Sequence, residues 1–162
     1  GGGKIILAEP SALLTPAAKM PGLDGQKMSK SYENTISLRE PIELIANKIK
    51  KMPTDPARIR LTDVGDPKKC PVWQLHEVYS DEETKLWAAG GCTTAAIGCL
   101  ECKNPVIDSI IAELEPIQKR AEEYEKDPDI VRSIILEGSE VAREEARATL
   151  NDVRVAMGLT NW

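Results

Sequence analysis

The stretch "SLREPIELIANKIKKM", Ser37 to Met52, sets the helical character of this chain. Ser37, followed three residues later by Glu40, forms a capping box, in which each side chain satisfies a backbone N–H at the start of a helix. Apolar residues then recur at helical spacing on one face: Ile42, Ile45, Ala46 and Ile49. We therefore predict an amphipathic helix that packs this face against a core.

Similar signals for helix starts and ends continue along the chain. Proline is favoured at the first helical position, Ser or Asn at the N-cap, and Gly after the last turn. The expected starts are Pro71, Ser80 with Glu83, and Asn104 with Pro105; the expected ends are Gly90–Gly91 and Gly158, with Gly138 as a candidate break in the last helix. Residues 37–162 are therefore predicted to form a mainly α domain, a helical bundle.

The first 36 residues have a different character. The apolar run Ile5–Leu7 predicts a short strand, and Pro10, Pro16 and Pro21 exclude a long helix after it. One short strand cannot form a sheet alone. We expect residues 1–36 to be the tail of a larger domain, and the absence of an initiating Met suggests that the chain is a fragment.

Charge is distributed unevenly along the 162 residues. Residues 1–60 carry 10 basic and 6 acidic side chains, whereas residues 61–162 carry 11 basic and 20 acidic ones. The first part favours anionic ligands, and nucleic-acid contact in the second part requires a local patch. No apolar run reaches the roughly 18 residues of a membrane span, and no signal peptide is apparent, so we expect a cytoplasmic protein without a membrane partner.

The loop "GLDGQKMSKSYENT", Gly22 to Thr35, concentrates charge and hydroxyl groups. Lys27 and Lys30 stand three residues apart, with Ser29 and Ser31 beside them. Lysine ammonium groups on a loop suit phosphate oxygens, and hydroxyl and N–H groups add donors. The alternative interpretation is a solvated basic turn before a helix.

Four cysteines, spaced C-x21-C-x6-C-x2-C, form the second candidate site: Cys70, Cys92, Cys99 and Cys102. Disulfides are rare in the cytosol, and a C-x2-C pair can chelate a metal centre. Four thiolates suit tetrahedral Zn²⁺ or an iron–sulfur cluster, and the single C-x2-C pair favours a 4Fe–4S cluster over zinc. The alternative is four small buried apolar residues.

Several segments resemble one family. "KMSKS" at Lys27–Ser31 is the signature of class I aminoacyl-tRNA synthetases, and its surroundings, "PGLDGQKMSKSYENTI", are similar to bacterial-type tryptophanyl-tRNA synthetases. "AEPSALLTPAAKMPGLDG" before the loop and "ARATLNDVRVAMGL" near the C-terminus resemble the same family. The resemblance extends from Glu9 to Leu159.

The resemblance implies a fold and an activity. Residues 1–36 would be the tail of a Rossmann-like α/β catalytic domain with the KMSKS loop, and residues 37–162 an anticodon-binding-type helical domain. The family joins tryptophan to ATP, with Mg²⁺, and passes the tryptophanyl group to tRNA(Trp), usually as a homodimer. Lys27 and Lys30 would be catalytic, holding the ATP phosphates within the binding set Lys27, Met28, Ser29, Lys30 and Ser31. No HIGH-type motif is present, so this chain alone is expected to be inactive.

The resemblance also bears on the cysteines, since some bacterial members carry a 4Fe–4S cluster on similarly spaced thiols. Lys68, Lys69 and Lys103 flank the cysteines and could contact tRNA phosphate or offset the negative charge of a cluster. Two other functions compete with the ligase: a freestanding metal-stabilised RNA-binding helical module, and a zinc-bound structural module without an RNA role. The lone histidine, His76, is expected on a helix surface or in the core, not as a catalyst.

Overall fold

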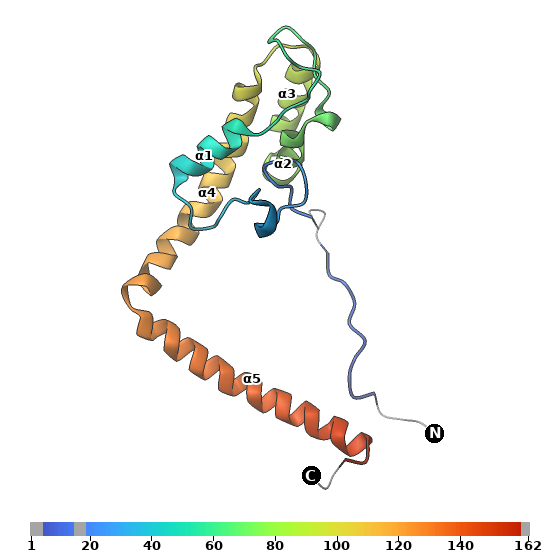
Figure 1. Cartoon of the computed structure of the whole chain (residues 1–162), viewed down its shortest axis with the longest axis vertical. Helices are drawn as coiled ribbons and strands as arrows, with labels where there is room; N and C mark the ends of the chain where they lie inside the picture. The colour runs from blue at the N-terminus through green and yellow to red at the C-terminus, as the bar shows by residue number, and fades with distance from the viewer. Residues whose placement is uncertain (1–4, 15–18, 160–162) are drawn as a thin grey trace. The chain divides into compact units, whose positions relative to one another are not determined.

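The structure, a computed structural model, describes residues 5–14 and 19–159 and is mainly helical within them (Figure 1). The α-helices are α1 (Ile42–Lys51), α2 (Pro71–Tyr79), α3 (Glu82–Thr93), α4 (Cys99–Lys126) and α5 (Pro128–Ala156). Two short 3₁₀ helices, η1 (Lys30–Tyr32) and η2 (Pro67–Lys69), precede α1 and α2. The prediction of a mainly α fold is confirmed.

The predicted strand at Ile5–Leu7 is wrong, because the structure has no strand within the described ranges. The nearest approach to a sheet is a single antiparallel bridge between Pro21 and Lys27. A strand is stable only beside a partner strand, and residues 5–14 have none in the described part of the chain. A Rossmann-like element is therefore not visible in these residues.

Contacts divide the chain into two units, Leu14–Arg120 and Gly1–Leu13 with Ala121–Trp162. The first unit holds the hydrophobic core, which joins α1, α2 and α4: Ile45, Ile49, Met52, Val72, Leu75, Val106, Ile107, Ile110 and Leu114. Ile45 and Ile49, from the predicted apolar face of α1, have no exposed surface. The core-facing stripe of α1 was thus correctly predicted, whereas the predicted N-cap, Ser37, is wrong, because the N-cap of α1 is Pro41.

The helix boundaries show where sequence signals mislead. The N-cap of α3 is Asp81, whose carboxylate accepts the Thr84 N–H at 2.8 Å. Ser80 instead ends α2. The predicted stop at Gly90–Gly91 is wrong, since α3 runs through both glycines. Gly91 is required there by packing, because a Cβ atom would lie 2.7 Å from Ile97.

The fourth helix also departs from prediction. It begins at Cys99 and contains both Pro105 and Pro116, whereas a start at Asn104–Pro105 was expected. A proline inside a helix removes one hydrogen bond. Burial of the apolar residues after Pro105 offsets this loss; they are Val106, Ile107, Ile110 and Leu114.

The second unit contains α5, which Gly138 does not interrupt. Gly158, with φ of 72°, follows its end in the left-handed conformation, as expected for a helix stop. None of the residues of α5 is buried. No helix in the described ranges is long and apolar enough to cross a membrane.

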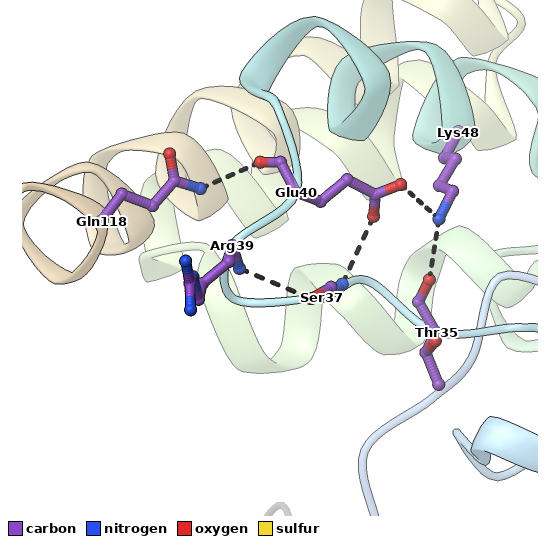
Figure 2. A network of polar contacts seen from close by, with 6 residues as sticks. All are labelled: Thr35, Ser37, Arg39, Glu40, Lys48 and Gln118. Carbon is purple, nitrogen blue, oxygen red and sulfur yellow. Dashed lines mark hydrogen bonds and ion pairs between the residues drawn. The ribbon is translucent and has the colours of Figure 1, made fainter. Parts of the chain in front are cut away.

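A polar network joins the segment after the signature loop to α1 and α4 (Figure 2). Glu40 accepts the Ser37 N–H at 3.3 Å and pairs with Lys48, which also donates to the Thr35 carbonyl at 3.2 Å. Gln118 donates to the Glu40 carbonyl at 2.9 Å. The predicted hydrogen bond from the Ser37 N–H to the Glu40 carboxylate is present, although α1 itself begins at Ile42. Residues 35–40 are thereby fixed against two helices of the core.

Candidate phosphate loop and four-cysteine site

The segment that carries the KMSKS motif is a closed loop. Pro21 and Lys27 form the antiparallel bridge, and the Gly22 N–H donates to the Gln26 carbonyl at 2.7 Å. Gly25 turns the chain at φ of 81°, a conformation that glycine adopts without strain. The Met28 N–H donates to the Met20 carbonyl at 2.9 Å. The start of the motif is thus held by the hydrogen bonds that close this turn.

The lysines of the motif point away from the core. Lys27 and Lys30 are exposed, as is Ser31, whereas Met28 and Ser29 are half-buried. Ser29 caps η1, because its hydroxyl accepts the Ser31 N–H at 3.3 Å. Lys30 is the first residue of η1, so this cap sets the direction in which Lys30 leaves the loop.

Met28 anchors the loop on its inner side. It lines an apolar groove together with Met20 and Ile36 from the same segment, and with residues of α2 and α4, among them Leu75 and Ile110. The methionine of the motif therefore has a packing role in this unit, while its two lysines remain in solvent.

The side chain of Asn34 is the least exposed polar group of this loop, at 4%. Its Oδ1 atom accepts the Ser29 N–H at 2.8 Å. Its Nδ2 atom donates to Asp24 Oδ1 at 2.7 Å and to the Lys27 carbonyl at 3.2 Å. Asp24 also accepts the Gln26 N–H at 2.9 Å, and these two bonds lower the pKa of its carboxyl, the Asn34 bond most. The sequence analysis missed this residue.

The four cysteines line one cavity. Cys70 is the N-cap of α2, Cys92 lies in the last turn of α3, and Cys99 and Cys102 stand in the first turn of α4. All four are half-buried free thiols. In the described part of the chain, no three or more His, Cys, Asp or Glu side chains are arranged to hold a metal ion.

Burial and electrostatic interactions change the pKa values of two of the thiols. Burial raises the pKa of Cys102 to about 12, and the other three cysteines add to the rise. Burial also raises the pKa of Cys92, against which the nearby Arg58 guanidinium acts. The thiols of Cys92 and Cys102 are therefore protonated at neutral pH unless a cation replaces the proton.

Arg58 and Gly65, in the loop between α1 and α2, lie beside the cysteines. Arg58 lines the cavity and donates to the carbonyls of Leu61 and Ile97, and the bond to Ile97 fixes the loop between α1 and α2 against the segment that precedes α4. The Gly65 N–H donates to the Cys92 carbonyl at 2.9 Å. A Cβ atom on Gly65 would lie 2.5 Å from Cys92 Sγ, so this position has no room for a side chain.

The lysines that flank the cysteines differ in their positions. Lys68 and Lys69 are exposed. Lys103 is only 3% exposed, and its Nζ atom donates to the carbonyls of Lys50 and Met52, each at 2.7 Å. Burial lowers the pKa of Lys103, and the thiols of Cys99, Cys70 and Cys102 oppose this shift. The interpretation of Lys103 as a contact to tRNA phosphate is therefore wrong.

His76 is a core residue, one of the two positions expected for it. It has no exposed surface, and burial lowers the pKa of its imidazole. Its Nδ1 atom lies 2.8 Å from Ser80 Oγ, and its Nε2 atom lies 3.1 Å from the Cys102 carbonyl oxygen. His76 thus connects α2 to the start of α4 next to the cysteine cavity.

Comparison with known proteins identifies the class. Residues 2–115 match the family described as tRNA synthetases class I (W and Y), and this chain belongs to that family. The relatives that it resembles include the tryptophan–tRNA ligase of Ralstonia nicotianae, 58% identical over 160 residues, which are 99% of this chain and 40% of the relative. The tryptophan–tRNA ligase of Thermotoga maritima is 44% identical over 156 residues, 95% of this chain and 47% of the relative.

The fold has a solved counterpart. A tryptophanyl-tRNA synthetase from Campylobacter jejuni, crystallised with ADP and tryptophan, matches with a TM-score of 0.71 at 24% identity, over 88% of this chain and 44% of that one. At this identity the match establishes the fold. The chain spans less than half the length of these relatives.

Proposed function

We propose that this chain is the C-terminal part of a tryptophan–tRNA ligase, which activates tryptophan with ATP and transfers it to tRNA(Trp). The observation that supports the proposal most is the KMSKS motif, with Lys27 and Lys30 exposed on an ordered loop, in a chain 58% identical to a tryptophan–tRNA ligase. The substrates are ATP with Mg²⁺, tryptophan and tRNA(Trp), and the ligase acts as a homodimer in the cytoplasm.

In this proposal, Lys27 and Lys30 bind the phosphates of ATP. The tryptophan carboxylate attacks the α-phosphorus, the bond to the pyrophosphate oxygen breaks, and negative charge grows on the leaving group. Two ammonium groups stabilise that charge more in the transition state than in the bound substrate. Ser29 and Ser31 support the loop, and Met28 anchors it in its groove.

We assign residues 37–162 to the anticodon-side helical domain and residues 1–36 to the end of the catalytic domain. The exposed Lys68 and Lys69, at η2 beside the cysteine cavity, are the residues we propose for contact with the tRNA backbone.

We further propose that Cys70, Cys92, Cys99 and Cys102 hold a 4Fe–4S cluster, with Zn²⁺ as the alternative. Four thiols around one cavity match the donor set of either group. Zinc requires four sulfurs about 2.3 Å from a single ion, whereas in a cluster each thiolate binds its own iron. The single C-x2-C pair, beside two separately spaced cysteines, favours the cluster over zinc. A bound cluster would act as a structural cross-link between α2, α3 and α4.

The ligase proposal is tested by building a chimera in which this chain replaces the matching part of the Ralstonia ligase. ATP–pyrophosphate exchange measures adenylate formation. Lys27→Ala and Lys30→Ala should each lower the exchange rate by roughly 100-fold, with tryptophan affinity unchanged. Lys119→Ala, an exposed lysine outside the motif, is the control. An equal loss of exchange and of tryptophan binding would contradict the assigned role.

The metal proposal is tested separately on the 162-residue chain. Anaerobic purification should give a brown protein with absorption at about 400 nm and about four irons and four sulfides. Cys102→Ser should lose that colour. A colourless protein with one zinc would replace the cluster by zinc, and a metal-free protein that iron and sulfide do not reconstitute would leave four core thiols.

A further inference from the structure

One side chain spans the two ends of the KMSKS turn. Asn34 Nδ2 donates to the carbonyl of Lys27, and Asn34 Oδ1 accepts the N–H of Ser29. The residue between them is Met28, whose own N–H is fixed by Met20. A single amide thus sets the separation of the backbone groups on either side of the motif's methionine.

The Asn34 side chain is buried in a closely packed slot. A Cβ atom on Gly22 would lie 2.3 Å from Asn34 Nδ2, and the Leu23 N–H donates to the Asn34 carbonyl at 2.9 Å. Asp24 accepts the remaining N–H of the amide at 2.7 Å. Every donor and acceptor of this side chain therefore has a partner within residues 24–29.

We propose that Asn34 is a positioning residue for phosphate binding, with Asp24 as its support. This inference rests on the proposed function, in which Lys27 and Lys30 meet the phosphates of ATP. By holding Ser29, Asn34 fixes the residue that caps η1 and hence the start of the segment from which Lys30 projects. By holding the Lys27 carbonyl, it fixes the backbone that carries the other ammonium group.

The physical consequence is preorganisation. An ammonium group on a fixed backbone meets the developing charge without ordering the loop during the reaction, so the benefit falls on the transition state. Loss of the amide should therefore lower kcat and leave tryptophan binding unaffected. A residue that served only general folding would alter both.

The first test uses the 162-residue chain and measures trypsin cleavage of the Lys27–Met28 bond by mass spectrometry. The carbonyl of this bond is the one held by Asn34. Asn34→Asp removes the donor and places a second carboxylate beside Asp24, so cleavage should accelerate by about tenfold or more. Asn47→Asp, the same change at an exposed position of α1, should cleave at the unchanged rate.

A rescue variant separates positioning from mere damage. In Asp24→Asn/Asn34→Asp, the amide and the carboxylate exchange places, so the contact between residues 24 and 34 and the bond from Ser29 can form again. Cleavage should return to within about threefold of the original rate, and the remaining difference measures the bond to the Lys27 carbonyl. Unchanged cleavage in Asn34→Asp, or no recovery in the double variant, would overturn the proposal.

The second test uses the chimera with the Ralstonia ligase. Asn34→Asp should lower kcat for ATP–pyrophosphate exchange by roughly 10- to 100-fold, leave KM for tryptophan unchanged, and recover in the double variant. If exchange depends on Lys27 but not on Asn34, the positioning role fails while the proposed function stands. If exchange does not depend on Lys27, the proposed function itself fails.

Discussion

His76 Nε2 lies 3.1 Å from the carbonyl oxygen of Cys102 and 3.4 Å from its sulfur, and this contact joins α2 to α4 in the interior. The imidazole is fully buried, and its other nitrogen faces Ser80. The lone histidine of the chain thus helps to fix the helix start that carries Cys99 and Cys102.

His76→Leu should destabilise the chain. The substitution keeps a side chain of similar size in the core but removes the imidazole that donates to the Cys102 carbonyl. The expected loss is about 1–3 kcal/mol in the free energy of unfolding. Urea unfolding followed by circular dichroism measures it. Gln74→Leu, at an exposed position of the same helix, is the control and should change stability by less than about 0.5 kcal/mol. Equal stability of the two variants would show that the buried contact contributes nothing.

Lys103→Met should also destabilise the chain, by about 1–3 kcal/mol, because the carbonyls of Lys50 and Met52 lose a charged donor. Lys68→Met removes an exposed charge and should have little effect on unfolding. In the metal-loaded protein, the loss in Lys103→Met should grow if its ammonium group offsets the charge of the bound centre. An identical loss with and without metal would limit Lys103 to its two carbonyls.

Gly65→Ala should lower the metal content of the purified protein. The new methyl group would occupy the space of Cys92 Sγ, at 2.5 Å in the present backbone, and would displace that thiol from the cavity. Gly90→Ala is the matched control, since nothing lies within 4 Å of its Cβ position in α3. It should retain metal and gain up to about 1 kcal/mol of stability. Full metal content in Gly65→Ala would contradict a role for Cys92 as a ligand.

The signature loop should loosen in acid. The pKa of Asp24 is lowered by its bonds from Asn34 and Gln26, so the ionised form stabilises the folded loop. That stabilisation is complete above the ordinary carboxyl pKa of 3.8 and is lost as the pH falls through the lowered value. NMR signals of the Asn34 side-chain amide should report this transition. Asp24→Asn should abolish the dependence, and an unchanged acid transition in that variant would assign it to another group.

The sequence predicted the exposed chemistry better than the buried polar contacts. The apolar face of α1 and the clustering of charge in the motif follow from residue type and spacing along the chain. The four cysteines, distant in sequence, do line one cavity as their grouping suggested. These predictions rested on residue type and residue spacing.

Other features depend on tertiary partners that no local pattern reveals. In the sequence, Asn34 is an ordinary polar loop residue. Its role becomes visible only in the folded loop, where it bonds to Asp24, Lys27 and Ser29. Asn104–Pro105 has the form of a helix start, yet the helix begins earlier, at Cys99, because the apolar residues that follow are buried. Lys103 reads as a surface charge, and only the carbonyls left open at the end of α1 explain its burial.

Lys103 also couples the stability of α1 to the packing of α4. Its donors satisfy carbonyls at the end of α1 across 51 and 53 residues of sequence, so α1 receives its C-terminal cap from another helix. A helix of ten residues is marginal by itself in water. The packing of α4 against α1 therefore stabilises the end of α1 in the folded unit. Within the unit Leu14–Arg120, the stability of α1 thus depends on a side chain of α4.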